Sequence, residues 1–163
     1  MTSIEFAMIA VPFIGLLFAI VETALLLFTN QALDTALQDT SRKIMTGEAQ
    51  NSGMTAAQFK NAVCAIATFN NCSSALYVDV KSYTSTAPVP TLPITNGVFD
   101  PSQFTFNPGC PNQIVVARVA MQYPVYSTLF GAGLQQLSNG ERVMMSTVSF
   151  RNEPYVTSNS GCS

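Results

Sequence analysis

The sequence contains no histidine, and charged residues make up only 10% of its 163 residues, against about a quarter in an average soluble protein. Without histidine there is no Ser–His or Cys–His pair for nucleophilic catalysis. The acidic residues Asp79, Asp100, Glu141 and Glu153 are dispersed along the chain, so a paired-carboxylate site has no support in the sequence. The sequence therefore predicts a protein that is not an enzyme and that uses no cofactor.

Basic residues are also few. The seven Lys and Arg are scattered from Arg42 to Arg151, whereas a nucleic-acid groove needs clustered cations. Gly131-Ala132-Gly133 lacks the rest of a phosphate-binding fingerprint. We therefore expect no nucleic-acid partner and no nucleotide site.

No C-x-x-C pair occurs among the four cysteines, and without histidine a zinc site is disfavoured. An even number of cysteines in a small domain favours disulfides and an oxidising compartment, although free buried thiols are an alternative. Three connectivities are possible. We favour pairing neighbours along the chain, as Cys64–Cys72 and Cys110–Cys162. The first bridge would pin a helix end to the following turn, and the second would staple the C-terminal tail to the body.

The chain begins with its most apolar segment. As a helix, Phe6–Phe28 is about 34 Å long, which is enough to cross the hydrocarbon core of a bilayer. A secretory signal peptide is disfavoured because a basic start and a small-residue cleavage site are missing. For a plain anchor, the positive-inside rule would place Arg42 and Lys43 in the cytoplasm together with the cysteines. This conflict disappears if a basic leader is removed before Met1, so we expect Met1 to be a processed N-terminus.

Helical periodicity continues beyond the apolar segment. Leu26, Leu33, Leu37 and Ile44 lie on one helical face, which predicts one helix of roughly 70 Å ending near Thr46. We divide the chain into an apolar helix half (1–28), an amphipathic half that packs on the head (29–47), and a disulfide-stapled globular head (48–163).

Two residues disturb the apolar half. Pro12 removes a backbone donor and clashes one turn back, and Gly15 weakens the next turn. We expect a kink or a short unwound stretch between Ala10 and Leu16.

Glu5 is an unusual residue for such a segment. A carboxylate in apolar surroundings costs several kcal/mol unless a cation meets it, and no Lys or Arg precedes Arg42. The nearest candidate cation is a terminal amine, either its own or that of an adjacent copy. This favours a chain that packs against copies of itself.

The run Met1-Thr2-Ser3-Ile4-Glu5-Phe6 resembles the start of a mature subunit of the type IV pilin-like superfamily. In that superfamily a dedicated peptidase cuts after a glycine, and glutamate occupies the fifth mature position. The resemblance implies a cut immediately before Met1, insertion in the inner membrane and extraction into a filament by an ATPase-driven machine. It also implies that Glu5 neutralises the N-terminal amine of a neighbouring subunit.

A narrower resemblance is to the TadE-like pilin family. It rests on Ile4-Glu5-Phe6-Ala7, on Pro12-Phe13, on Glu22 followed by Asn30-Gln31-Ala32-Leu33-Asp34, and on the late run Phe150-Arg151-Asn152-Glu153-Pro154. Members of that family are described as minor pilins, so a major and a minor role both stay open. The assembly residues that we predict are Met1, Glu5, Phe6, Pro12, Gly15 and Glu22.

Glu22 is a second acidic residue in the apolar half and has two interpretations. It forms an inter-subunit hydrogen bond or ion pair that sets the helix register, or it lies in water at the far membrane interface.

The sequence of the head predicts a small domain that contains both helices and strands. Thr55 is the expected cap of a helix that runs to about Thr68. Strands are expected at Leu76–Tyr83, Ile114–Tyr123 and Arg142–Phe150, with a short helix at Ser127–Leu137 and turns at Asn70-Asn71 and Asn139-Gly140. The Pro-rich segment from Thr84 to Gly109 is expected to be an ordered surface excursion anchored by Phe99, Phe104 and Phe106.

These elements predict an α+β, pilin-like fold. Its long N-terminal helix packs on a roughly three-stranded antiparallel sheet through Leu33, Leu37 and Ile44. Tyr77, Tyr123 and Tyr126 are expected in the sheet and core.

We interpret the chain as a structural subunit of an extracellular type IV pilus-like (Tad-type) filament, located in the inner membrane before assembly. Its partners would be copies of itself, the pilus assembly machinery and the prepilin peptidase. One alternative is a minor pilin that primes or tips a filament of another pilin. Another is a single-pass, membrane-tethered periplasmic adaptor.

Overall fold

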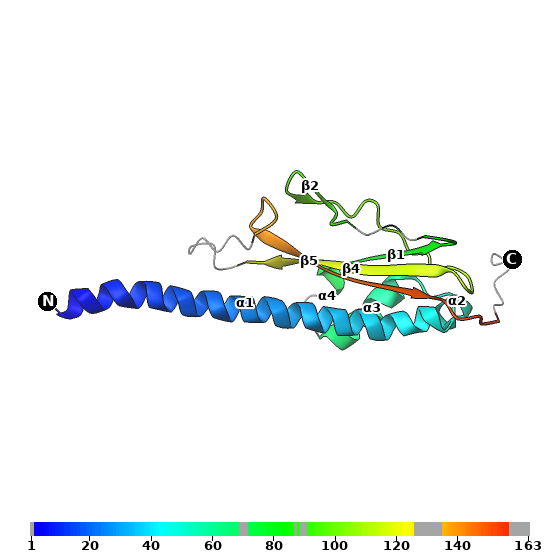
Figure 1. Cartoon of the computed structure of the whole chain (residues 1–163), viewed down its shortest axis with the longest axis horizontal. Helices are drawn as coiled ribbons and strands as arrows, with labels where there is room; N and C mark the ends of the chain where they lie inside the picture. Colours follow the sequence, from blue (N-terminus) through cyan, green and yellow to red (C-terminus); the bar gives the residue numbers. More distant parts are fainter. Residues whose placement is uncertain (1, 69–71, 87, 89–90, 126–134, 157–163) are drawn as a thin grey trace.

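The computed structural model describes residues 2–68, 72–86, 88, 91–125 and 135–156. A long helix runs along one side of a small sheet and projects well beyond it (Figure 1), which confirms the predicted α+β class. The elements in chain order are α1 (Thr2–Met45), α2 (Glu48–Asn51), α3 (Ala56–Ala67), α4 (Cys72–Ala75), β1 (Leu76–Tyr83), β2 (Ile94–Thr95), β3 (Val98–Phe99), β4 (Ile114–Pro124) and β5 (Glu141–Arg151).

Helix α1 is continuous through Pro12. Of the two alternatives that we expected between Ala10 and Leu16, the unwound stretch is therefore not present, and the kink stays a prediction. A proline inside a helix removes one N–H donor, and the hydrogen bonds of the flanking turns are sufficient to keep this segment helical. With 44 residues, α1 is about 66 Å long, close to the predicted length.

The C-terminus of α1 ends at a tight turn that the returning chain closes. Gly47 has φ 82°, a left-handed conformation that glycine adopts without a steric penalty. An added Cβ at Gly47 would collide with the ring of Tyr155. The backbone N–H of Glu153 donates to the carbonyl of Met45 at 2.9 Å. Residues after β5 therefore cap the helix that begins the chain.

Strands β1, β4 and β5 form an antiparallel sheet in the order β1-β4-β5, which confirms the predicted meander. Alternation along the central strand separates the two faces. Val115, Ala117 and Val119 belong to the core on the α1 side, whereas Ala120 belongs to a second cluster on the other face. Apolar residues thus cover both faces of β4, which we did not predict.

The main core lies between α1, α3 and the sheet. Leu33, Leu37 and Ile44 are fully buried, as predicted, together with Phe59 and Val63 of α3. Helix α3 begins at the expected cap: the Thr55 N–H donates to Gln58 Oε1 at 2.8 Å, and the Gln58 N–H donates to Thr55 Oγ1 at 3.3 Å. This capping box satisfies two otherwise unpaired N–H groups.

The Pro-rich excursion is ordered over its described residues and covers the outer sheet face. The ring of Phe99 lies 5.0 Å from that of Tyr77 and 6.0 Å from that of Phe104, while Phe106 packs against Phe59 at 5.6 Å. The aromatic anchors are therefore confirmed. The small β2–β3 hairpin within the excursion was not predicted, nor were α2 and α4.

Several expectations concern residues that are not described. The helix expected at Ser127–Leu137 falls largely outside the described residues, as do the Asn70-Asn71 turn and Tyr126. Tyr77 and Tyr123 pack against the two apolar clusters, as expected.

Candidate assembly surface

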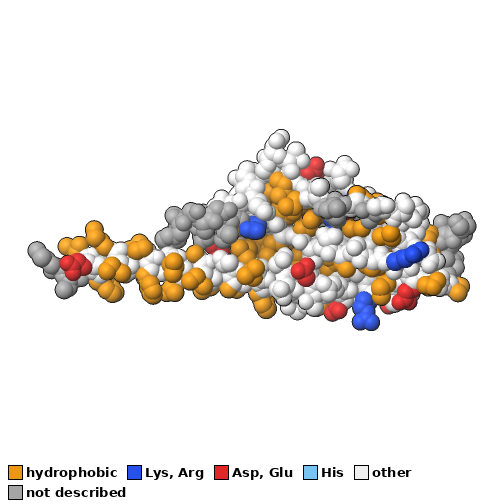
Figure 2. Space-filling view, viewed as in Figure 1, with side chains coloured by type: hydrophobic (Ala, Val, Ile, Leu, Met, Phe, Trp, Pro, Cys, Tyr) orange, Lys and Arg blue, Asp and Glu red, His pale blue; other side chains and the backbone are white. Residues whose placement is uncertain are grey.

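The N-terminal half of α1 exposes a continuous apolar surface, which we call the projecting half (Ile4–Phe28). Apart from Leu26, which is 7% exposed, its large apolar side chains are 46–75% exposed, from Leu17 to Met8. Figure 2 shows hydrophobic side chains along the projecting helix, whereas the visible face of the head mixes hydrophobic patches with polar side chains, backbone and a few charged side chains. Monomeric soluble proteins rarely expose apolar patches larger than a few hundred Å². This surface therefore requires a lipid or protein environment.

Length and composition make α1 able to cross a membrane. The most apolar stretch of the candidate span has a mean hydropathy of 2.5, and only 6% of that stretch is buried by the rest of the chain. The core helix of a soluble protein would be mostly covered. Each of these Leu, Ile, Val, Phe or Met side chains contributes about 1.5–3 kcal/mol when it leaves water, so the same surface also supports association between helices.

Glu5 lies in the first turn of the projecting half and is exposed. No described Lys or Arg lies within ion-pair distance of its carboxylate. The first basic residue in the sequence, Arg42, is about 55 Å further along the helix. Arg142 of the head lies beside Thr23 and Leu26, about 27 Å along the helix from Glu5, which is also too far for an ion pair.

Glu22 differs from Glu5 because the single chain already buries it. Its side chain is 8% exposed and makes an interaction within the chain. The interpretation in which Glu22 lies in water at the membrane interface therefore does not fit the structure. A contact with a neighbouring subunit stays a prediction.

The other predicted assembly residues occupy the same helix. Phe6 is 74% exposed, Pro12 is exposed, and Gly15 is buried. Met1 lies outside the described residues. The structure thus brings Glu5, Phe6, Pro12, Gly15 and Glu22 onto one helix, and their roles in assembly stay predictions.

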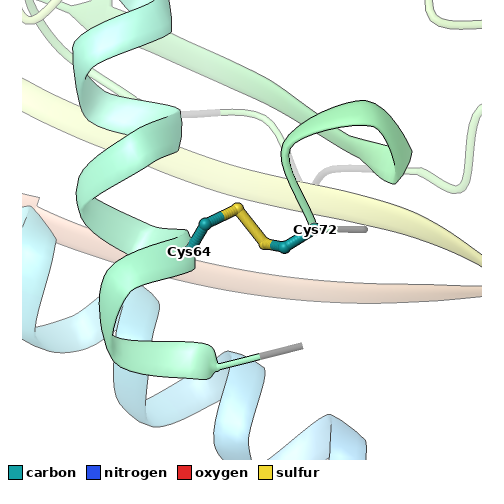
Figure 3. The surroundings of a disulfide bond; sticks show 2 residues. All are labelled: Cys64 and Cys72. Carbon is teal, nitrogen blue, oxygen red and sulfur yellow. A yellow bond between two sulfur atoms is a disulfide. The ribbon is translucent and has the colours of Figure 1, made fainter. Parts of the chain in front are cut away.

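A disulfide joins Cys64 near the end of α3 to Cys72 at the start of α4 (Figure 3). This is the predicted pairing, and it closes a short loop beside the core. Cys110 is also disulfide-bonded. Its predicted partner Cys162 lies outside the described residues, so the second bridge stays a prediction.

A cleft of about 550 Å³ lies between α1 and the start of the edge strand β5. Its walls include Leu26 and Leu27 of α1, Arg142 and Met144 of β5, and Leu92 of the excursion. Sequence reasoning missed this cleft because its walls come from three distant segments. In the sequence, the one feature that could have indicated the cleft is Arg142, a charged residue at the start of an otherwise apolar strand.

A second group missed from the sequence is an ion-pair cluster on the outer sheet face. Arg118 Nε donates to Asp79 Oδ2 at 2.6 Å, and Asp79 is 2% exposed. Lys81 lies 3.6 Å from the same carboxylate. These groups tie the excursion to the sheet. No group of three or more His, Cys, Asp or Glu with metal-binding geometry occurs among the described residues.

Residues 1–42 match the family model described as TadE-like protein, which covers the projecting half of α1 and most of the segment that packs on the head. No curated protein and no solved structure matches the chain.

Proposed function

We propose that the chain is a structural subunit of an extracellular type IV pilus-like filament. The match of residues 1–42 to the model of TadE-like proteins supports this proposal. The observation that carries this proposal is the projecting half of α1, which stays exposed while the rest of the chain forms a folded head. In a filament, the projecting halves of many copies form the core and the heads form the outer surface. Burial of apolar helix surface supplies most of the cohesion.

Glu5 sets the register of neighbouring helices in this proposal. Its carboxylate pairs with the N-terminal amine of an adjacent subunit, because no side-chain cation of its own chain is within reach. A buried charge without a partner is strongly destabilising, so a subunit at the wrong axial position is rejected. Without Glu5 the N-terminal amine of the neighbour would be buried without a partner, so the pairing contributes to fibre yield as well as to register.

Before assembly the subunit resides in the inner membrane, with its head on the oxidising side. The disulfide Cys64–Cys72 agrees with that compartment. Prepilin peptidase and the assembly machinery are the partners at this stage, and no enzymatic activity belongs to the chain itself.

The second candidate function is a membrane-tethered adaptor. It is favoured by the length of α1, since one helix of this length and composition crosses a bilayer without any partner. A minor pilin that primes or tips a filament of another protein shares features with both candidates. The amount of this chain that is recovered in sheared fibres distinguishes the three functions.

The test compares Glu5→Ala with Glu48→Ala, which removes an exposed carboxylate of the head that lies 3.9 Å from Lys43. Fibres sheared from cells are quantified, and their N-termini are identified by mass spectrometry. We expect abundant fibres of the native chain and of Glu48→Ala, but at least tenfold fewer for Glu5→Ala, equivalent to about 1.4 kcal/mol or more. The amount of chain in the membrane should be equal for all three.

Normal fibre yield for Glu5→Ala would contradict the pairing. Recovery of the native chain only from the inner membrane would favour the tether. Recovery in trace amounts within fibres of another protein would favour the minor pilin.

A further inference from the structure

We propose that the cleft between α1 and β5 binds one membrane phospholipid, with an acyl chain inside the cleft and the phosphate beside Arg142. This inference rests on the membrane-inserted stage of the proposed function.

The position of the cleft along α1 matches the surface of a bilayer. A hydrocarbon core of about 30 Å corresponds to about 20 helical residues. If the core begins near Ile4, where the exposed apolar side chains begin, it ends within a turn of Thr23. The helix wall of the cleft is Thr23, Leu26, Leu27 and Asn30, which therefore lies at head-group depth. A lipid of the outer leaflet is the molecule present at that level.

The shape of the cleft suits one flexible chain better than a second helix. Clefts of about 300–1,000 Å³ accommodate small molecules, and this one measures about 550 Å³. A single turn of α-helix, about 10 Å across and 5.4 Å long, already occupies about 420 Å³. Two turns need about 850 Å³, which exceeds the volume of the cleft, so the projecting half of another copy cannot enter it by more than about one turn.

The walls have the chemistry that an acyl chain requires. Leu26, Leu27, Leu92, Val143 and Met144 provide apolar surface, and methionine side chains adapt readily to irregular ligands. The apolar surface is continuous with that of the projecting half through Leu27, which lines the cleft and is 64% exposed. An acyl chain can thus enter from the bilayer without crossing water.

Arg142 is the ionisable group among these described walls. A guanidinium has five N–H donors and matches phosphate oxygens in a bidentate manner. Arg142 already makes an interaction within the chain, so the phosphate is an additional acceptor. The neighbouring Glu141 alternates to the other side of the strand, and its Oε2 accepts from Asn139 at 2.8 Å.

The absence of tryptophan from the sequence allows a site-specific test in the full-length chain. Leu92→Trp places one fluorophore in the cleft at a side chain that is 45% exposed, and Val98→Trp places one on the same excursion outside the cleft, at 59% exposure. Each variant is reconstituted in vesicles of phosphatidylethanolamine and phosphatidylglycerol with brominated acyl chains. We expect severalfold quenching at Leu92→Trp and little at Val98→Trp.

Arg142→Gln and Arg151→Gln provide the matched pair, since the two arginines stand near opposite ends of β5. In the Leu92→Trp background, Arg142→Gln should remove most of the quenching and Arg151→Gln should leave it unchanged. Circular dichroism checks that all variants are folded. Added inorganic phosphate should leave the quenching in place, because a free phosphate has no acyl chain and therefore cannot displace a lipid that is held at both its phosphate and its chain.

Absence of quenching at Leu92→Trp overturns the proposal. Equal quenching at Val98→Trp also overturns it, since the head would then merely rest on the bilayer. Loss of quenching on addition of inorganic phosphate assigns the site to a free anion, and dependence on protein density assigns it to a second copy. Fibre yield is measured separately. If Leu92→Trp is not quenched but the native chain still forms fibres, only the lipid site is refuted. If Leu92→Trp is quenched but the native chain forms no fibres, only the filament function is refuted.

Discussion

Asn152 shows how one buried polar residue organises the end of the head furthest from the projecting half. It is 2% exposed, and its Nδ2 donates to the carbonyls of Pro108 and Cys110 at 3.0 and 3.1 Å. Its backbone N–H also donates to the carbonyl of Gln113. Buried polar groups are costly unless they are paired, so these bonds hold the chain after β5 against the loop before β4. The run Phe150–Pro154, noted in the sequence for its resemblance, therefore has a structural role.

Tyr155, also a single residue, is expected to make the stability of the fold depend on pH. Burial raises the pKa of its phenol, against the lowering effect of hydrogen bonds with Gln50 and Asn152. The folded pKa lies above the unfolded value of about 10, so this contribution to stability is complete below about pH 10 and is lost as the pH rises through the folded pKa.

We expect Tyr155→Phe to remove this part of the alkaline destabilisation. The urea midpoint of the native chain should fall more steeply than that of Tyr155→Phe between about pH 9 and pH 11. Measurement at neutral pH controls for the loss of the hydroxyl itself. Parallel curves for the two proteins would show that the phenol does not contribute.

At the scale of elements, the excursion is fastened to the sheet by charge as well as by aromatic packing. Asp79 and Arg118 are cross-strand partners on β1 and β4. Asp79 accepts from the N–H of Thr105 at 2.7 Å, and Arg118 Nη1 donates to the carbonyl of Thr91 at 2.9 Å. The Arg118 guanidinium also lies 4.9 Å from the centre of the Phe104 ring. The pair thus binds both ends of the β2–β3 region.

We predict that Asp79→Asn destabilises the head by about 3 kcal/mol, because it leaves the nearly buried Arg118 cation without its counter-ion. Urea unfolding measures the loss, and hydrogen exchange should rise at 91–105 before it rises in β4. Lys81→Gln is the matched control, since Lys81 is more exposed and stands further from the carboxylate. Equal effects of the two substitutions would refute a special role for the Asp79–Arg118 pair.

At the scale of the whole molecule, the chain has two halves with opposite solvent requirements. The head buries its apolar residues on both sides of the sheet, whereas the projecting half of α1 leaves them exposed. The amphipathic part of α1 belongs to the head, because Leu33, Leu37 and Ile44 are part of its core. Removing residues 1–28 should therefore remove the association surface and keep most of the core.

We predict that a chain of residues 29–163 is a folded, soluble monomer, whereas the full chain needs detergent or lipid to stay dispersed. The physical reason is the apolar area of the projecting half, which water does not tolerate in a monomer. Light scattering after gel filtration without detergent measures the mass of each form, and thermal unfolding checks the fold. A full-length chain that is monomeric in plain buffer would contradict the assembly surface.

Much of the architecture was visible in the sequence because it follows from local periodicity. The spacing of Leu33, Leu37 and Ile44 indicated the buried face of the helix, and Thr55 indicated the start of α3. The failures involve local expectations that the continuing helix overrides, such as the unwound stretch at Pro12. They also involve short elements such as α2, which are too brief to show a period.

The sequence by itself determined the apolar projecting helix, the three strands and the lone acid near the N-terminus, since these depend on residue type and on the backbone repeat of each element. Only the tertiary structure decided that Asp79 meets Arg118, that Glu22 is buried within its own chain, and that Arg142 lines a cleft beside Leu26. Each of these depends on where segments distant in the sequence come together, and no local periodicity encodes that placement.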